Sequence, residues 1–158
     1  MYHYDMENQL GYGKEPECKD DPAYKLDHGP GAYVANAMCA ARQNKEYRSA
    51  FWTGTNLQMT LMSVPVGGEI GLEMHPDTDQ MVRVEEGQGV ARIGNRKGQL
   101  EFEQYLGIND VVFVPAGTWH NIVNTGRYAL KLSSIYGPPK HPKGTVNHTK
   151  ADAEKKAY

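Results

Sequence analysis

The sequence predicts an all-β protein, and three observations support this fold class. After Tyr47, short apolar or alternating runs follow one another, and Gly, Asn and Pro separate them at the spacing of antiparallel β-structure. Helix-forming runs are almost absent from this part of the chain. Alternating strands bury their apolar faces by packing against one another, so they favour a sandwich or a jelly-roll barrel. A chain of 158 residues suits one such domain.

The predicted strands are short and follow one another closely. They cover residues 49–53, 57–65, 69–75, 80–86, 89–93, 99–105, 110–114, 120–124 and 130–136. Between two of them, the segment GNRKG at 94–98 is expected to form a hairpin turn.

Residues outside the strands divide the chain into three segments. Residues 1–31 are rich in Gly, Pro and charge, so we expect an irregular N-terminal arm whose tyrosines lie on a surface, of this subunit or of a neighbour. The domain proper is expected over 32–148, where 32–45 begins as a short strand and continues into one or two helical turns. Residues 149–158 are expected to form a short helix with Thr149 as its N-cap.

Composition argues against several classes of partner. The formal net charge is −2 and no Lys/Arg run occurs before the last few residues, so a nucleic acid is not expected. No stretch of about 18 apolar residues predicts a membrane span, and the N-terminus lacks the pattern of a signal peptide. Cys18 and Cys39 lack a CxxC spacing, so we expect two reduced thiols. Together these features predict a soluble cytoplasmic protein.

Two segments, 68–89 and 114–124, contain the candidate metal ligands. Glu73 and His75 are two residues apart, so on an extended strand both side chains leave the same face. Gln80 follows a polar turn, and His120 comes from far downstream. Four donors from separate strands can surround a small cation, and such a site implies binding or catalysis.

These segments resemble the paired motifs of the cupin superfamily, small β-barrels that hold a divalent metal. The first motif has a glycine, two histidines separated by one residue, a carboxylate and a closing glycine. The matching residues are Gly67 or Gly68, Glu73, His75, Gln80 and Gly87. The second motif is matched by Pro115, Gly117, His120 and Asn124, with Asn109 in place of its leading glycine. The resemblance spans about a third of the chain and implies a jelly-roll barrel with an internal metal.

The departures from the family pattern compensate each other. Glu73 stands where a histidine is usual, and Gln80 stands where a glutamate is usual, so the ligand set keeps one negative charge. The segment GLEMHPD is also similar to the metal site of type I phosphomannose isomerases, with the Gln and Glu roles exchanged. Two imidazoles, a carboxylate and an amide suit Mn, Fe, Co, Ni or Zn better than Ca or Mg. Four protein ligands would leave one or two positions open.

Other polar residues near the motifs are expected to have structural or solvent-exposed roles. Asp77 and Asp79 are expected in an exposed turn. Asn124 fits equally a donor facing the cavity and a turn residue. His141 and His148 are expected to be solvated rather than to lie across the barrel mouth, and Trp119 is expected to pack on the face opposite His120.

The leading functional hypothesis is a metal-dependent enzyme that isomerises or epimerises a small polar molecule, such as a sugar or sugar phosphate. Two alternatives remain open: a non-haem metal oxygenase, and a non-catalytic module that binds a small ligand. No catalytic base can be assigned from the sequence. A homodimer is expected because open sheet edges and the tyrosine-bearing arm need covering, and size-exclusion chromatography with light scattering would test it.

Overall fold

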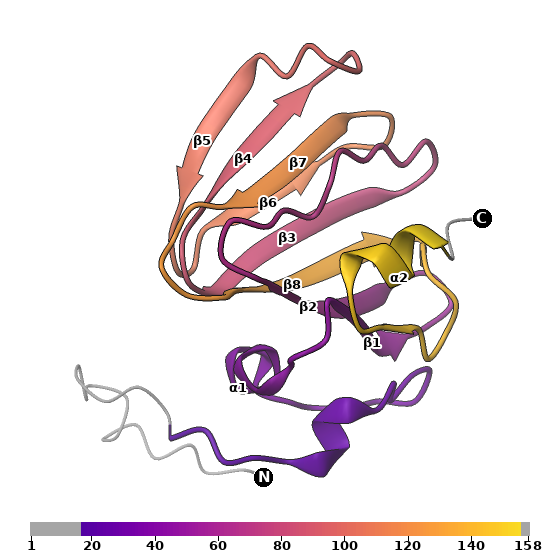
Figure 1. Ribbon diagram of the computed structural model, residues 1–158. Helices are drawn as coiled ribbons and strands as arrows, with labels where there is room; N and C mark the ends of the chain where they lie inside the picture. Colours follow the sequence, from indigo (N-terminus) through magenta and orange to yellow (C-terminus); the bar gives the residue numbers. More distant parts are fainter. Residues whose placement is uncertain (1–16, 156–158) are drawn as a thin grey trace, which may run out of the picture.

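A computed structural model describes residues 17–155, which fold as two facing β-sheets with two short α-helices (Figure 1). The strands of the larger sheet lie in the order β6-β3-β8-β2-β1-β9, and those of the smaller sheet in the order β5-β4-β7. The strands are β1 (Arg48–Thr53), β2 (Gln58–Val64), β3 (Asp79–Glu86), β4 (Gly89–Gly94), β5 (Phe102–Leu106), β6 (Val111–Val114), β7 (Trp119–Asn124), β8 (Leu130–Gly137) and β9 (Val146–Asn147). All paired strands are antiparallel, so the predicted all-β jelly-roll class is confirmed, although neither sheet closes into a barrel within residues 17–155.

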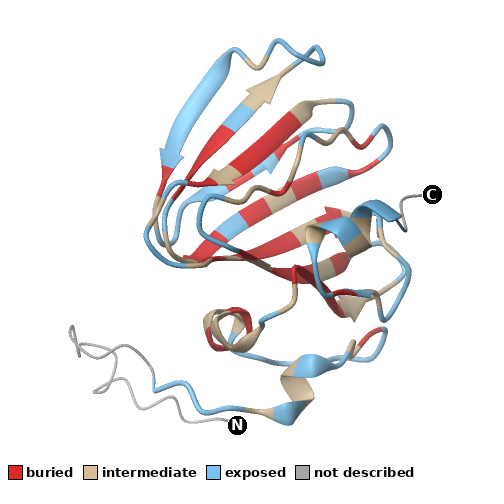
Figure 2. Cartoon of the chain, in the orientation of Figure 1, coloured by how far each residue is buried: buried red, intermediate tan, exposed pale blue. Residues whose placement is uncertain are grey.

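The core lies between the two sheets and consists of the inward-facing side chains of alternating strand residues. Val64 on β2, Val84 on β3 and Leu132 on β8 are fully buried, and Ile122 meets them from β7. Burying such a side chain contributes about 1.5–3 kcal/mol. Figure 2 shows buried residues along the strands of both sheets, whereas β5 is exposed over most of its length.

Eight of the nine strands expected from the sequence form, with ends shifted by a few residues. The exception is 69–75, which makes only isolated bridges, Glu69 to Val123 and Glu73 to His120. The physical reason is Gly71, whose φ of 91° interrupts the regular pleat. In addition, β9 pairs with β1 through only two residue pairs, which is too short a strand for a periodic signal.

The helices agree only in part with the expectations. No strand forms over 32–36; instead Asn36 caps α1 (Ala37–Gln43) by accepting a hydrogen bond from the Cys39 amide at 3.0 Å. α1 covers the outer face of the larger sheet, where Ala40 and Ala41 pack against Phe51 and Leu61. A 3-10 helix, η2 (Pro22–Lys25), precedes it.

The expected C-terminal helix is present as α2 (Lys150–Lys155). Its N-cap is Thr149, as predicted, since the Thr149 Oγ1 accepts from the Asp152 amide at 3.1 Å. The Asp152 carboxylate accepts in return from the Thr149 amide at 3.1 Å, which completes a reciprocal cap. The expectations for residues 1–16 and 156–158 lie outside the described residues.

The cysteine prediction is wrong, because Cys18 and Cys39 form a disulfide across a sequence separation of 21 residues. The segment before η2 is held against α1 by Gln43, whose side chain accepts from the Asp21 amide at 2.7 Å and donates to the Asp21 carbonyl at 2.8 Å. This tertiary contact brings together two cysteines whose spacing alone gives no sign of pairing. The two cysteines therefore give no support to the reducing cytoplasm expected from the sequence. Among residues 17–155, no helix is long and apolar enough to cross a membrane.

The disulfide gives a test of stability. Reduction should lower the free energy of unfolding by about 3 kcal/mol, because the cross-link restricts a loop of 21 residues in the unfolded chain. Urea unfolding with and without reductant measures the change, and a Cys18→Ser/Cys39→Ser variant should show no effect of reductant. Two titratable thiols in the unreduced, denatured protein would contradict the pairing.

Candidate metal centre

The segment 69–75 lies against the start of β7, and this pairing positions the first candidate ligands. The Glu73 amide donates to the His120 carbonyl, and the His120 amide donates to the Glu73 carbonyl, both at 2.9 Å. The His75 carbonyl accepts from the Gly117 amide at 2.8 Å, and Gly117 has a φ of 79°, which suits the predicted Pro-x-Gly turn before His120. The Glu73–His120 bridge and the Gly117–His75 hydrogen bond therefore bring the two sequence motifs together at the site.

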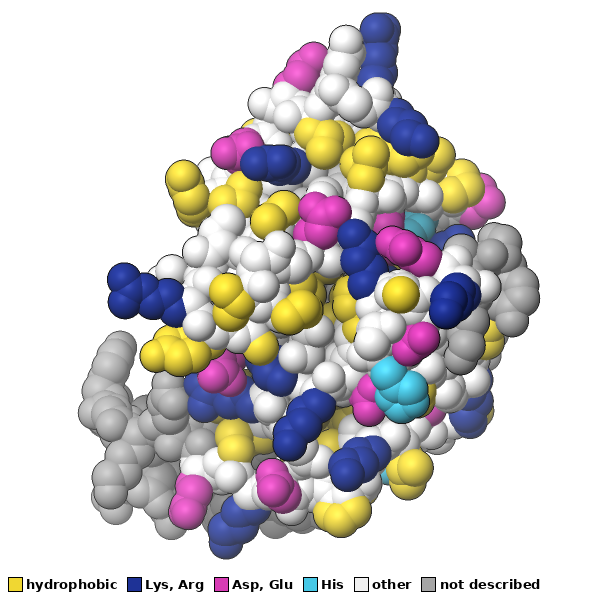
Figure 3. Space-filling view, in the orientation of Figure 1, with side chains coloured by type: hydrophobic (Ala, Val, Ile, Leu, Met, Phe, Trp, Pro, Cys, Tyr) yellow, Lys and Arg dark blue, Asp and Glu magenta, His cyan; other side chains and the backbone are white. Residues whose placement is uncertain are grey.

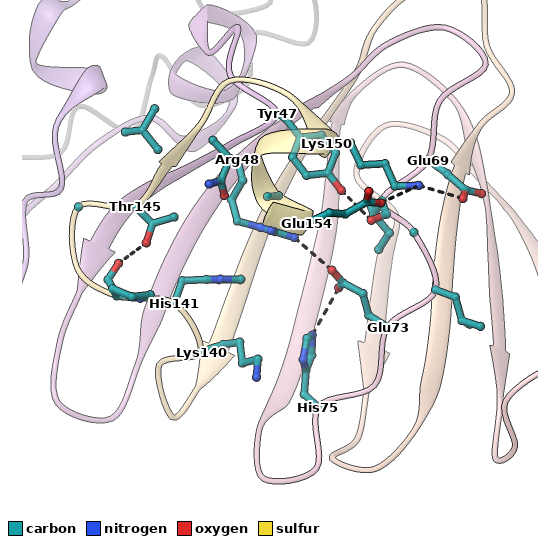
Figure 4. Close-up of a pocket in the computed structure, with 18 of the residues that line it drawn as sticks. Tyr47, Arg48, Glu69, Glu73, His75, Lys140, His141, Thr145, Lys150 and Glu154 are labelled. Atoms are coloured by element: carbon teal, nitrogen blue, oxygen red, sulfur yellow. Dashed lines mark hydrogen bonds and ion pairs between the residues drawn. The ribbon is translucent and has the colours of Figure 1, made fainter. Parts of the chain in front are cut away.

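Three of the predicted ligands lie close together. The Glu73 Oε2 is 3.5 Å from the His75 Nε2 and 3.8 Å from the His120 Nε2. All three ligand atoms lie within 4.8 Å of one another, so a single ion could contact them after small side-chain movements. Both histidines are buried, and Figure 4 shows Glu73 and His75 side by side at the cavity wall.

Gln80, the fourth predicted ligand, is buried on β3 opposite Tyr136 of β8. The Tyr136 ring in turn lies 5.8 Å from the His75 ring. The Gln80 side-chain amide donates to the Ser134 Oγ at 3.4 Å, which leaves its oxygen available.

Buried polar atoms without partners fit a metal ion. Within the described chain, the Nε2 atoms of His75 and His120 and the Oε1 atom of Gln80 are buried and have no hydrogen-bond partner. Such atoms are costly unless a group absent from the polypeptide satisfies them. The two histidine nitrogens belong to the cluster with Glu73, and a divalent transition ion accepts from imidazole nitrogen and carboxylate oxygen atoms. The donor set therefore fits a metal.

The electrostatics of the cluster keep its members in the forms that bind metal. Burial would raise the pKa of Glu73, but His75, the charge of Arg48 and His120 outweigh it and lower that pKa, so the carboxylate is ionised. Burial lowers the pKa of His120, so its imidazole is neutral. Metal binding requires both of these forms.

Sequence reasoning missed Arg48, the first residue of β1. Its Nη2 lies 3.2 Å from the Glu73 Oε1, while the other oxygen of the same carboxylate faces the two histidines. Arg48 therefore orients Glu73 and leaves one oxygen free for an ion. A buried arginine on a strand looks in sequence like an ordinary solvated residue, so no signal identified it.

A cavity of about 750 Å³ opens in front of Glu73 and His75. Its walls come from β1, from 69–75, from the segment 140–147 and from α2. The face of the molecule in Figure 3 has interspersed basic and acidic side chains, without an extended area of one charge.

The favoured prediction for His141 is wrong, because this residue lines the cavity, as the alternative position across the barrel mouth had implied. The fully buried Gln58 fixes its backbone: the Gln58 Oε1 accepts from the amides of Lys140 and His141, at 3.2 and 2.9 Å. The Gln58 Nε2 donates to the His141 carbonyl at 2.8 Å. Burial, and after it the positive charge of Arg48, lowers the pKa of His141 to about 3.

His148, Asp77 and Asp79 have the solvent-exposed positions expected of them, and Asn124 has one of the two roles that its sequence fits equally. His148 is exposed, and its Nδ1 lies 2.5 Å from the Glu46 Oε2. Asn124 has the turn role: it donates to the carbonyls of Val64 and Tyr128, and its oxygen accepts from the Gly126 amide. Asp77 and Asp79 are exposed, and Asp79 accepts from the Ala116 amide at 2.8 Å. Asn109 has a φ of 73°, so it occupies the left-handed conformation that the glycine of the second motif would adopt easily.

Comparison with known proteins agrees with the fold. Residues 60–136 match the family model described as Cupin domain. The chain is 50% identical over 127 residues to the uncharacterized protein YrkC of Bacillus subtilis, covering 80% of this chain and 68% of YrkC. It is 36% identical over 116 residues to the uncharacterized protein L612 of Acanthamoeba polyphaga mimivirus, covering 73% of this chain and 71% of L612.

Solved structures give the same result. The crystal structure of BH2720 from Bacillus halodurans superposes with a TM-score of 0.81 at 50% identity, covering 82% of this chain and 98% of that chain. KdgF from Halomonas sp. shares the fold, with a TM-score of 0.52 at 17% identity, covering 59% of this chain and 78% of that chain. Fold and donor cluster thus define a jelly-roll protein with a candidate metal centre. The chain belongs to the cupin superfamily.

The depressed pKa of His141 predicts a pH dependence of stability in metal-free protein. In the unfolded chain this histidine takes up a proton below a pH of about 6.5, whereas the folded protein resists protonation down to a pH of about 3. The free energy of unfolding should therefore fall as the pH is lowered between these values, and His141→Asn should reduce the slope. Urea unfolding at pH 7 and pH 4.5 measures it. The exposed His148, replaced by Asn, is the control, and equal slopes for His141→Asn and the unmodified protein would contradict the assignment.

Proposed function

We propose that this cupin is a divalent-metal-dependent enzyme that isomerises or epimerises a small polar molecule, such as a sugar or sugar phosphate. The observation that supports the proposal best is the meeting of Glu73, His75 and His120, with ligand atoms within 4.8 Å of one another beside a cavity of about 750 Å³. Gln80 is the fourth proposed ligand, because its buried oxygen lacks a partner among the described residues.

The proposed ligands suit Mn, Fe, Co, Ni or Zn. When bound, such an ion polarises an oxygen atom of the substrate and makes a neighbouring proton easier to remove. Arg48 keeps the Glu73 carboxylate oriented, with one oxygen directed to the histidines. The buried walls around the histidines limit the access of water to this position.

An isomerase or epimerase also needs a base, and His141 is our candidate. Its Nε2 is buried without a hydrogen-bond partner among the described residues, and its low pKa keeps the imidazole neutral at pH 7. An imidazole with a pKa of about 3 is a weak base, so it could take a proton from the substrate only where a bound ion has made that proton more acidic, and would return it at another position. This transfer leaves no net change in oxidation, so no further reactant is needed.

The metal proposal is tested by composition. His75→Ala and His120→Ala should each lose stoichiometric metal, because each removes one of the nitrogen ligands from a cluster of three. Elemental analysis after dialysis against trace metal measures the occupancy. His148→Ala is the matched control, since this exposed histidine lies at the Glu46 ion pair and should leave the occupancy unchanged. Full occupancy in His120→Ala would count against the proposed centre.

The reaction class is tested with metal-loaded protein and a panel of aldoses, ketoses and sugar phosphates. Turnover is expected, and His141→Asn should lower kcat by about 10²- to 10⁴-fold while keeping the metal, because only the base is removed. If the panel is bound without turnover, a non-catalytic binding module is the better description. Oxygen uptake after Fe(II) loading would instead indicate the oxygenase alternative. The homodimer and the cytoplasmic location expected from the sequence stay predictions.

A further inference from the structure

We infer that the cavity takes a small anionic molecule and holds its carboxylate or phosphate group against Arg48 and Lys140, while another oxygen of the molecule faces Glu73 and His75. The inference deepens the proposed function by naming the chemical class of its ligand, and it rests on that proposal.

The arrangement of the cavity walls is the first support. Glu73 and His75 come from the segment that pairs with β7, whereas Arg48 comes from β1 and Lys140 and His141 come from the segment after β8. Figure 4 shows Arg48 extending towards Glu73, with His141 and Lys140 beside it on the wall that faces His75. A small molecule in this space would therefore contact the candidate metal ligands on one side and basic side chains on the other.

The charge of the lining is the second support. Four basic and three acidic side chains line the cavity, and a divalent ion would raise this excess of one positive charge to three. Lys150 is already balanced, because its Nζ lies 3.1 Å from Glu69 and 3.9 Å from Glu154. Arg48 is likewise paired with Glu73, so among the described residues the basic side chains of the lining without an acidic partner are Lys140 and Lys143, and a divalent ion would add two more positive charges. A neutral polyol could hydrogen bond there but would not offset this charge.

The burial of Arg48 is the third support. Its side chain is only 6% exposed, and within the described chain its Nε has no hydrogen-bond partner. Its guanidinium donates to the Glu73 Oε1 through Nη2. A guanidinium has five N–H donors in a planar fork that matches a carboxylate or a phosphate. Donors therefore remain for a ligand.

The clamp by Gln58 is the fourth support. A fully buried amide makes three hydrogen bonds to the backbone of Lys140 and His141, at 3.2, 2.9 and 2.8 Å. These bonds hold two cavity-lining residues in place before any ligand arrives, which reduces the entropy lost on binding. Residues held in this way are expected in the wall of a ligand-binding cavity.

The experiment compares matched anionic and neutral ligands by isothermal titration calorimetry on the full-length protein dialysed against Mn(II). Ribose 5-phosphate is paired with ribose, and lactate is paired with propane-1,2-diol, so that the two arms separate phosphate from carboxylate recognition. We expect at least one anion to bind about 10-fold or more tighter than its neutral partner, because a hydrogen bond to a charged group contributes that much. The preference should weaken as salt is raised.

Variants locate the effect. Arg48→Met and Lys140→Met should each weaken anion binding by about 10-fold, and Lys140→Met should change the binding of the neutral partner little. Lys140→Met is the more direct of the two, because Arg48 also orients Glu73. Arg127→Met is the control. Arg127 is exposed in the turn that follows the end of β7, whereas His120 lies near the start of this strand.

Two readouts keep the proposals distinguishable. The first readout is the metal content of each protein, which tests the proposed metal site. The second is the ratio of the affinities for an anion and its neutral partner, which tests the inference about the ligand. Equal binding of both anions and their neutral partners, or an anion preference that survives Arg48→Met and Lys140→Met, overturns the inference whatever the metal content.

Discussion

The pairing of residues 69–75 with the start of β7 is the interaction on which the site depends. Reciprocal backbone hydrogen bonds place Glu73 directly opposite His120, and His75 is tied to the turn before β7 through Gly117. The same turn and bridge therefore fix ligands that are distant in sequence. Since the backbone sets the positions, the carboxylate needs only one further partner, Arg48, to orient its two oxygens differently.

The fold and most of the candidate site were predictable because both depend on local patterns. Alternation identified eight strands, and the spacing of Glu73, His75 and His120 within two motifs identified three side chains that meet in the structure. The exception at 69–75 has a local cause, since Gly71, with a φ of 91°, interrupts the strand between the bridges at Glu69 and Glu73. Alternation of apolar and polar residues does not report a single residue in the left-handed conformation.

The features that the sequence did not reveal all depend on contacts between distant segments. Arg48 is buried and bonded to Glu73, which lies 25 residues away, and the backbone of His141 is held at the cavity by Gln58, which lies 83 residues away. The Cys18–Cys39 disulfide follows from the docking of the segment before η2 onto α1. None of these residues has a neighbour in sequence that would distinguish it from a solvated arginine, histidine or cysteine.

The Gln58 clamp holds the cavity wall formed by Lys140 and His141, which belongs to a different segment of the chain from the candidate metal ligands. The candidate metal ligands lie within residues 73–120, whereas Lys140 and His141 belong to a later segment that Gln58 attaches to the larger sheet. Substitutions at 140 and 141 can change the chemistry facing the cavity while the backbone bonds to Gln58 persist, because those bonds involve no side-chain atom of the loop. The side chains of the attached segment can therefore change on a backbone that Gln58 holds, so the chemistry of this cavity wall can change without any change in the candidate metal ligands.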